Sequence, residues 1–417
     1  MATYLYRTFS TATNRKIWTW SGWVKRTNLV SDHTNALFGA YYDGSNRSVI
    51  RFNGHRLQFQ DSANSVDVLT TRLFRDPNAW YHIVARVDTT QSTASDRIRF
   101  YVNGIQETAF DTSNYPSQNL NMEFQGAVVH YINARRNGSG TVDSIASMVY
   151  SHVHFADGQS LAPTVFGETD STTGEWKINT SPSFTLGTNG FTILKDGNTF
   201  TDQSSNSNNW TQAGSTGLIS KTEDCPSNIF ATWNPLHHST QSFSNVVLKN
   251  GNTTFDNNET GSAVYPQGYS TLAASSGKYY FESKLIASSS DASMIGISGA
   301  VTTEAYVGND AYTYVFRSNG TTRNNDNSAG TYTGWGVGDI VQVAVDLDNN
   351  KLYFGINGTW QNSGDPTSGS TGTGAIFTIT APSSTPHGVY HFTLGDTSSA
   401  GSFEHATNFG NGYFGTT

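Results

Sequence analysis

The sequence of 417 residues has little charge, almost no cysteine and no long apolar run. Asp, Glu, Lys and Arg make up 13% of it, about half of the roughly 25% that soluble domains usually carry. The single cysteine, Cys225, excludes an intramolecular disulfide framework, so the fold must be stable by packing alone. No stretch approaches the length of a membrane span, and the first residues show no basic region followed by an apolar core. We therefore expect no membrane insertion and no signal peptide.

Clusters of basic residues are also missing. The formal net charge is −8, and Lys and Arg adjoin only in pairs such as Lys25-Arg26 and Arg135-Arg136. Binding to nucleic acid draws on the neutralisation of many phosphates by such side chains. The sequence therefore predicts no nucleic-acid partner.

Catalytic motifs are absent as well. A glycoside hydrolase needs two carboxylates facing each other about 5 to 9.5 Å apart, and no predicted strand carries such a pair. Glu168 and Asp170 lie in a Gly/Thr-rich turn, where a solvated or capping role is expected. No Gly-x-Ser-x-Gly elbow, phosphate loop or His-Glu-x-x-His motif occurs. We expect a protein that is not an enzyme.

Glycine and aromatic residues are abundant, with 40 Gly and 13% Phe, Trp and Tyr. This composition suits tight turns between strands that bury large side chains. Apolar and polar residues alternate in short runs, and no window keeps a helical period. The sequence thus predicts an all-β protein, and its length predicts two antiparallel β-sandwich modules.

Residues 1–156 carry the clearest strand patterns. The run from Ser48 to Gln60 predicts a hairpin with Asn53-Gly54 as its two-residue turn. Trp80 to Asp88 predicts a half-buried strand, with Tyr81, Ile83, Ala85 and Val87 on its apolar face. The next strand, from Arg97, should pair with it and turn at Asn103-Gly104.

Beyond residue 156 the periodicity first weakens and then returns. Residues 157–242 are rich in Gly, Asn and Ser but keep many aromatics, so we expect a connector packed on the first module. Residues 243–417 again predict short strands and form the second sandwich. The expected strands are Lys278–Glu282, Met294–Ile297, Tyr312–Phe316, Ile340–Leu347 and Lys351–Ile356.

Two domain families are suggested by ordered motifs. Trp80-Tyr81-His82-Ile83-Val84, followed by the run Ile98 to Gly104, resembles the laminin-G-like branch of concanavalin A-like lectin domains, with their jelly-roll sandwich. The second half resembles a SPRY domain. Its matching motifs are Gly277 to Glu282, Ile295-Gly296-Ile297, Gly338 to Asp348, Lys351 to Trp360 and Asn408-Phe409-Gly410.

The segment between these modules resembles structural proteins of marine tailed phages, through His154 to Leu161 and Cys225 to Leu236. The resemblance implies a virion surface protein, made in the host cytoplasm, that decorates the capsid as a head fibre or belongs to a tail fibre. Its implied partners are other capsid or tail proteins and a host-surface glycan or protein. Symmetric copies raise avidity, so we expect a homotrimer. The alternative is a cellular carbohydrate-binding or scaffolding protein with no virion role.

The candidate binding residues are aromatics in polar loops. Tyr41 and Tyr42 beside Asp43, and Trp210 among asparagines, are of the type that stacks on sugars. For Trp18, Trp20, Trp23, Trp80, Trp335 and Trp360, which lie in or beside predicted strands, core packing is expected instead.

Metal ligands are weaker candidates. Asp43, Asp61 and Asp67 could contribute to a Ca²⁺ site, which needs six to eight converging oxygens. His152 and His154 would present two imidazoles to one strand face, but no third ligand can be assigned. No cofactor other than this possible Ca²⁺ is expected.

Overall fold

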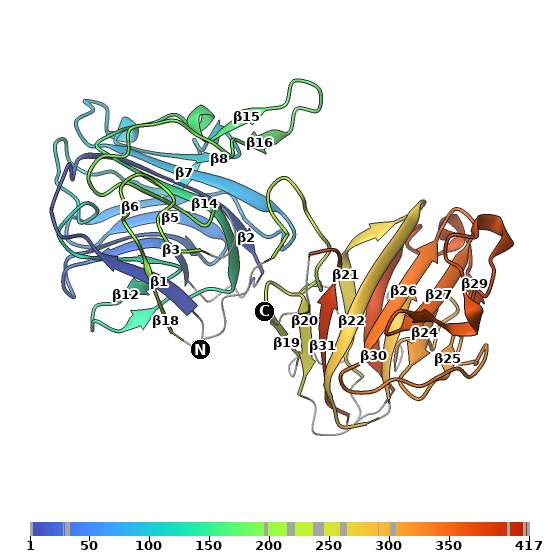
Figure 1. Ribbon diagram of the computed structural model, residues 1–417. Coiled ribbons are helices and arrows are strands. Elements are labelled where there is room, and N and C mark those ends of the chain that lie inside the picture. The colour runs from blue at the N-terminus through green and yellow to red at the C-terminus, as the bar shows by residue number, and fades with distance from the viewer. Residues whose placement is uncertain are drawn as a thin grey trace. The chain divides into compact units, whose positions relative to one another are not determined.

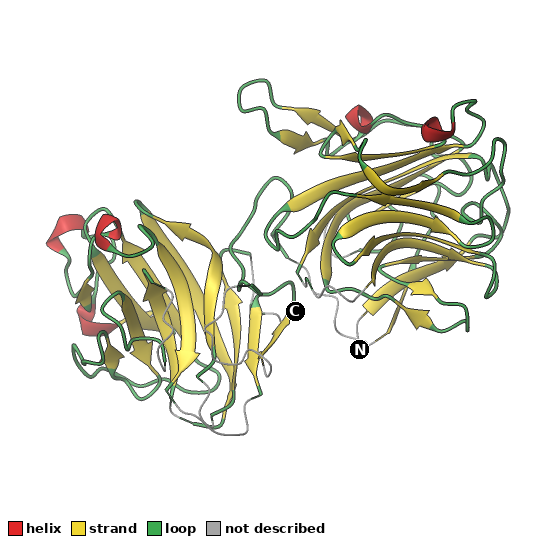
Figure 2. Cartoon of the chain, turned by 180° about the vertical axis from the view of Figure 1, so that it is seen from behind, coloured by secondary structure: helices red, strands yellow, loops and turns green. Residues whose placement is uncertain are grey.

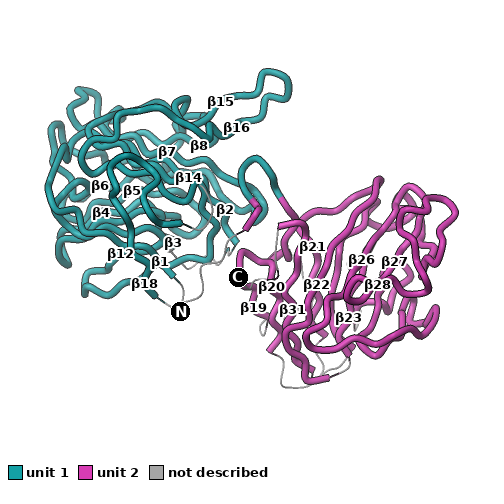
Figure 3. The backbone as a smooth tube through the Cα atoms, in the orientation of Figure 1, with its two compact units in different colours: residues 1–221, 225–229 teal, residues 222–224, 230–417 magenta. Residues whose placement is uncertain are grey.

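The computed structural model describes residues 3–27, 29, 34–195, 199–214, 222–236, 246–258, 265–290, 292–300, 306–397, 401–411 and 414. The chain divides into two compact units, which are coloured separately in Figure 3. Unit 1 comprises residues 1–221 and 225–229, and unit 2 comprises residues 222–224 and 230–417. Residues 157–221 therefore belong to the first unit and supply strands to it.

Both units are β-sandwiches, which confirms the predicted fold class (Figures 1 and 2). All strand pairs of the described residues are antiparallel. Besides strands, the described residues form only five short 3-10 helices: Ala94–Asp96, Pro163–Val165, Gln361–Ser363, Gly369–Thr371 and Pro382–Ser384. Within the described part of the chain, no helix has the length and apolar character needed to cross a membrane.

The described residues of unit 1 form an eight-stranded sheet packed on a six-stranded one. The larger sheet has the order β10 (Phe110–Asn114), β6 (Val66–Thr70), β5 (Arg56–Asp61), β4 (Arg47–Asn53), β3 (Thr34–Tyr41), β11 (Val129–Ile132), β1 (Thr3–Thr8), β18 (Thr211–Gly214). The smaller has the order β17 (Phe191–Ile193), β14 (Met148–Asp157), β2 (Ile17–Arg26), β7 (Trp80–Asp88), β8 (Ile98–Val102), β9 (Ile105–Gln106). Two ribbons complete the unit: β12 (Arg135–Arg136) with β13 (Val142–Asp143), and β15 (Gly167–Thr169) with β16 (Trp176–Ile178).

Large aromatic side chains fill the space between these two sheets. Trp18 and Trp20 on β2 are fully buried, and the Trp18 ring lies 4.9 Å from that of Phe124. Trp335 lies in the core of unit 2. Trp23 and Trp80 are also buried, at 4% and 5% exposed, but Trp23 stacks on His82 on the outer side of the six-stranded sheet. Trp360 is only partly buried.

The two predicted hairpins form, but one turn is displaced by a residue. Asn103 and Gly104 both have positive φ and join β8 to β9, as predicted for a two-residue primed turn. In the β4–β5 hairpin, however, Asn53 still pairs with Arg56, so Gly54 and His55 make the turn. Gly54 alone has positive φ, which fits the primed turn type that places glycine first.

Strand β7 pairs with β8 as predicted, but it is buried on both faces rather than one. Tyr81, Ile83, Ala85 and Val87 face the core, whereas Val84 packs on the other side with Tyr101 and Phe166. The outer side is covered by residues that follow β14, including the β15–β16 ribbon seen beside β7 and β8 in Figure 1. The residues of β7 alone do not reveal that its second face is covered.

The described residues of unit 2 also form two sheets. The larger has the order β19 (Val246–Lys249), β20 (Thr254–Asn257), β31 (Phe403–Asn408), β22 (Lys278–Ser288), β26 (Ile340–Asp346), β27 (Lys351–Ile356), β28 (Thr359–Trp360), with β29 (Phe377–Thr378) also on β27. The smaller has the order β21 (Gln267–Ala274), β30 (Tyr390–Asp396), β23 (Ser293–Ser298), β24 (Thr313–Arg317), β25 (Thr322–Arg323). All five strands predicted for this half are present, and Phe281, Ile295 and Phe354 lie in its core.

Candidate binding site

The predicted residue Tyr41 lies on the outer face of the eight-stranded sheet, turned away from the sandwich core. On β3, Phe38 and Ala40 point into the core, so the alternation of side chains places Tyr41 on the opposite face. The same alternation places Tyr131 of β11 and Tyr4 and Tyr6 of β1 on this outer face, because Ile132 and Leu5 are core residues. Since β3, β11 and β1 are neighbours, the tyrosines form one group.

An arginine lies over this group. The guanidinium carbon of Arg136, on β12, is 5.4 Å from the centre of the Tyr41 ring and 5.9 Å from that of Tyr131. The rings of Tyr4 and Tyr131 are 6.0 Å apart. We call Tyr4, Tyr6, Tyr41, Tyr131 and Arg136 the tyrosine–arginine cluster. Within the cluster, Tyr131 is buried, whereas Tyr6 keeps 36% of its surface exposed.

Gly39 explains how β12 reaches this position. A Cβ atom at residue 39 would lie 3.0 Å from the carbonyl oxygen of Ala134 and 3.4 Å from the Cα of Arg135. The missing side chain therefore lets the β12–β13 ribbon pass close to β3. From there Arg136 lies over the tyrosines, and Gly39 is thus a structural requirement of the cluster.

The two arginines of β12 have different surroundings. Arg135 Nε is 3.0 Å from a carboxylate oxygen of Asp143 and also donates to the Ser144 hydroxyl at 2.9 Å. Arg136 makes no ion pair with any described carboxylate, and its buried Nε–H has no hydrogen-bond partner in the described part of the chain. The guanidinium of Arg136 thus keeps donors that the protein does not use.

Burial raises the pKa of Tyr131, with smaller contributions from the neighbouring tyrosines and an opposing one from Arg136. Its hydroxyl therefore stays protonated at neutral pH and can donate a hydrogen bond. No protein partner within the described residues accepts from or donates to the hydroxyls of Tyr4, Tyr6, Tyr41 or Tyr131. The cluster thus presents aromatic rings, hydroxyls and one cation that remain available to a ligand.

A polar ladder continues this face across β4, β5 and β6. Arg51 Nε donates to Gln58 at 2.7 Å, and Gln58 Nε2 donates to Asp67 at 2.7 Å. Burial lowers the pKa of Arg51 to about 10, and the positive charges of Arg135 and Arg47 act in the same direction. Asp67, a predicted calcium ligand, is therefore engaged in the ladder and lies away from Asp43 and Asp61.

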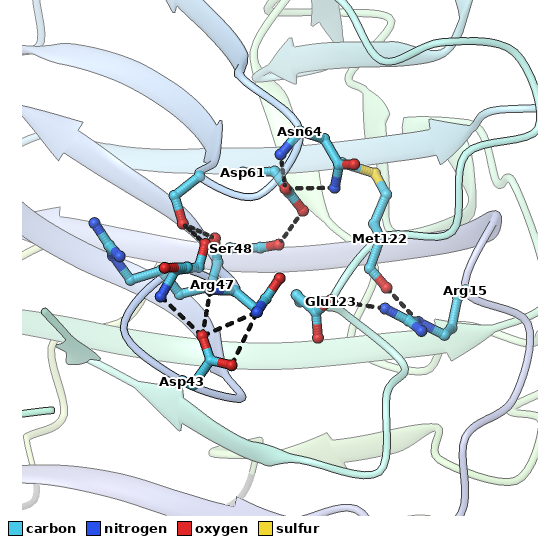
Figure 4. Close-up of polar contacts among 11 residues, drawn as sticks. Arg15, Asp43, Arg47, Ser48, Asp61, Asn64, Met122 and Glu123 are labelled. Atoms are coloured by element: carbon cyan, nitrogen blue, oxygen red, sulfur yellow. Dashed lines mark hydrogen bonds and ion pairs between the residues drawn. The ribbon is translucent and has the colours of Figure 1, made fainter. Parts of the chain in front are cut away.

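Asp43, in the loop after β3, and Asp61, the last residue of β5, are drawn in Figure 4. Tyr42 is 66% exposed. Asp43 accepts hydrogen bonds from the backbone N–H groups of Ser45 and Asn46 at 2.8 and 2.9 Å, and from the Asn46 side chain. The Asn46 side chain and these N–H groups lower the pKa of Asp43. The carboxylate thus closes its own turn.

Asp61 and Glu123 lie in the same view. Asp61 accepts from the Ser48 hydroxyl at 2.6 Å and from Asn64 Nδ2 at 2.8 Å. Glu123 pairs with Arg15 at 2.9 Å, and its pKa is raised by burial and by the charges of Asp61 and Asp43, while Arg15 opposes the shift. The carboxylates are close enough to repel one another, but each has local partners.

The proposed calcium ligands are therefore not brought together. Asp43 and Asp61 lie in these loops, whereas Asp67 lies on the ladder. Among the residues that the structure describes, no three His, Cys, Asp or Glu side chains form a group able to hold a metal ion. The rings of His152 and His154 are neighbours, with centres 6.3 Å apart, although β14 is irregular between Ser151 and His154 and His152 has positive φ.

Trp210 is placed differently from the expectation of a surface loop. It is 3% exposed and its ring lies 4.9 Å from Phe191, inside the core. The asparagines around it suggested a loop, but Asn208 uses its amide to donate to the carbonyls of Thr188 and Gly190. Trp210 therefore anchors the start of β18, and a sugar could not reach it.

Asp170, which the sequence placed beside Glu168, has a structural role. Its carboxylate pairs with Lys177 at 2.6 Å and accepts from the backbone N–H groups of Thr172 and Thr173 at 2.8 Å. Lys177, followed by these N–H groups, lowers the pKa of Asp170. The carboxylate thus holds the β15–β16 ribbon together.

Each unit contains a segment that matches a different family model. Residues 3–146 match the family model of the concanavalin A-like lectin/glucanases superfamily, and residues 278–394 match that of the SPRY domain. The chain contains both domains. Domains of these kinds generally bind or scaffold, and no match to a purely enzymatic family was found. The tyrosine–arginine cluster lies entirely within the concanavalin A-like domain.

Several solved structures are similar to part of this chain. The SPRY domain of human HERC1 is 14% identical, with a TM-score of 0.34, and the match covers 43% of this chain and 98% of that one. Stonustoxin is 13% identical, with a TM-score of 0.30 and coverage of 43% and 27%. The TRIM65 PSpry domain is 10% identical, with a TM-score of 0.29 and coverage of 42% and 90%. No curated protein matches the chain significantly.

Proposed function

We propose that this chain is a non-enzymatic binding protein of a phage virion surface, in a capsid decoration, head fibre or tail fibre, and that its concanavalin A-like domain contacts a host-surface glycan. The observation that carries the glycan part is the tyrosine–arginine cluster. The virion part draws on the order of the two domains and on the phage-like segments His154 to Leu161 and Cys225 to Leu236.

The chemistry of the cluster suits a carbohydrate. Tyrosine rings offer flat apolar surface for the C–H face of a sugar, and their hydroxyls can exchange hydrogen bonds with sugar hydroxyls. Tyr41 and Tyr6 supply this surface, and Arg136 adds donors in a planar fork. Single glycan contacts of this kind are weak, so the proposal includes a homotrimer whose symmetric copies raise avidity.

A glycan array tests the binding part. Tyr41→Ala and Tyr6→Ala should each weaken the signals that the wild-type chain gives, because each removes ring surface and a hydroxyl. Tyr279→Ala is the matched control, since Tyr279 is 46% exposed on the SPRY domain. Array signals that survive both cluster variants would reject this site, and the absence of any signal would reject glycan binding.

The virion part needs a separate experiment. Light scattering should give the mass of a trimer, and the purified chain should co-sediment with phage particles stripped of accessory proteins. A chain that binds glycans but ignores particles would contradict the virion role and leave the cellular carbohydrate-binding alternative.

A further inference from the structure

We infer that the tyrosine–arginine cluster selects glycans that carry an anionic group, a carboxylate or a sulfate, and that Arg136 is the residue that binds this group. This inference rests on the proposed glycan binding and names the class of sugar. It follows from three features of the outer face: an arginine without a partner, a local excess of positive charge, and hydroxyl donors around it.

The first feature is the contrast within β12. Arg135 is neutralised by Asp143 at 3.0 Å, while Arg136 faces no described carboxylate and its Nε–H remains without an acceptor. A guanidinium is a planar fork of donors that matches the two oxygens of a carboxylate or sulfate. The Nε of Arg136 is itself covered, but its terminal nitrogens make no hydrogen bond with a described residue and are not buried, so they can receive an acceptor with two oxygens.

The second feature is the charge around Arg136. Arg51 is influenced by the positive charges of Arg135 and Arg47 and by the negative charges of Asp67 and Asp143. Among these five residues and Arg136 there are four guanidinium groups and two carboxylates, an excess of two positive charges on a chain whose net charge is −8, and the Arg56–Asp111 pair on the same sheet adds no net charge. A polyanion is repelled by the rest of such a molecule and attracted to this face.

The third feature is the set of tyrosines. Tyr41 and Tyr131 lie below the guanidinium, so a sugar ring stacked on Tyr41 would bring its substituents beside Arg136. Burial raises the pKa of Tyr131, so its hydroxyl is a donor at neutral pH, and a donor near an anion adds a charge-assisted hydrogen bond. A neutral sugar could use the rings but would leave the arginine without an acceptor. The face therefore discriminates by charge.

The test uses the full chain and three sets of oligosaccharides of equal length: polyuronate, sulfated dextran and neutral dextran. Biolayer interferometry should show tighter binding of at least one anionic set than of neutral dextran, and added salt should weaken it. Arg136→Gln should reduce the affinity for the anionic set by about tenfold or more, and Arg136→Lys should give an intermediate loss. The preferred set distinguishes carboxylate from sulfate.

Arg75→Gln is the matched control, because Arg75 is exposed, lies outside the cluster and makes no hydrogen bond or ion pair with another described residue. It removes the same charge and should leave binding unchanged. Equal binding of neutral and anionic sets, or equal loss in both variants, would overturn the selectivity while leaving glycan binding intact. A chain that binds no glycan on the array would instead overturn the proposed function itself.

Discussion

The two units have similar aromatic cores, but the outer faces of their sheets differ in how far they are covered. In unit 1, Trp176 and Phe166, which follow the concanavalin A-like domain in sequence, cover the outer face of the six-stranded sheet around His82, and the Trp176 indole donates to His82 Nδ1 at 3.0 Å. In the SPRY domain, Tyr280 on the outer face of β22 stays 43% exposed and its hydroxyl is bonded to Glu282 and Gln342. A covered face serves stability, and an exposed face whose polar groups satisfy one another has little left for a ligand. By this criterion the tyrosine–arginine cluster is the exception, because Tyr6 is exposed and the polar groups of the cluster have no hydrogen-bond partner among the described residues.

The domains also differ in how many neutral histidines they bury. Burial lowers the pKa of His82, His130 and His154 in unit 1 to about 3, and does the same for His405 in unit 2. The unfolded chain takes up these protons below about pH 6.5, so the stability is fully present above that pH and is lost as the pH falls toward 3.

The largest expected effect is therefore a difference in acid sensitivity. Each such histidine costs about 1.4 kcal/mol per pH unit below pH 6.5, so the three in unit 1 cost about 4 kcal/mol per unit and His405 in unit 2 costs about 1.4. Burial also lowers the pKa of His55 in unit 1 and of His391 in unit 2, so each unit gains one further contribution of the same sign. Pulse proteolysis in urea between about pH 7 and pH 5, with fragments assigned by mass, measures each unit. Equal slopes for the two units would contradict the buried-histidine account.

A smaller effect is expected from the covering layer. Trp176→Phe removes the indole N–H that His82 Nδ1 accepts, leaving a buried acceptor without a partner, and should cost unit 1 about 1 to 3 kcal/mol. Trp360→Phe is the control in the SPRY domain. Trp360 is partly exposed, its ring contacts that of Tyr280, and its indole N–H makes no hydrogen bond with another described residue. A loss no larger than the control's would show that the layer does not stabilise β7.

The smallest effect is expected at the carboxylate loops of Figure 4. Asp43 and Asp61 are satisfied by neighbouring N–H and hydroxyl groups, so calcium should leave the melting temperature of unit 1 unchanged relative to a chelator. Differential scanning calorimetry measures this directly. A calcium-dependent rise in melting temperature would mean that these loops rearrange into a cation site. It would favour the loops over the sheet face as the binding site.

Much of the fold could be predicted from alternation and turn chemistry, because strands and hairpins are encoded locally. The β7–β8 pair and the Asn103-Gly104 turn follow from their own residues. The covering of β7 could not be predicted, since Phe166 and Trp176 are far away in sequence and the strand would look the same without them. The displaced turn at Gly54 follows from pairing register, which the dipeptide does not determine.

The site was predictable only in part. Tyr41 and Tyr42 were proposed because they lie beside Asp43-Gly44, and of the two only Tyr41, at the end of β3, belongs to the cluster. Trp210 was misplaced because its polar neighbours are bonded to the backbone of another segment. Arg136, Tyr4, Tyr6 and Tyr131 were missed, although the alternation Tyr4-Leu5-Tyr6 signals two tyrosines on one strand face. Nothing local reveals that β12 folds over Gly39 and brings Arg136 to them.

The central claim is that the concanavalin A-like domain binds an anionic glycan on the outer face of its larger sheet. Hydrogen exchange measured by mass spectrometry, with and without the preferred anionic oligosaccharide, tests it most directly. Protection should appear in peptides that cover β1, β3, β11 and the β12–β13 ribbon. Protection confined to the carboxylate loops around Asp43 and Asp61, or to the SPRY domain, would contradict the claim.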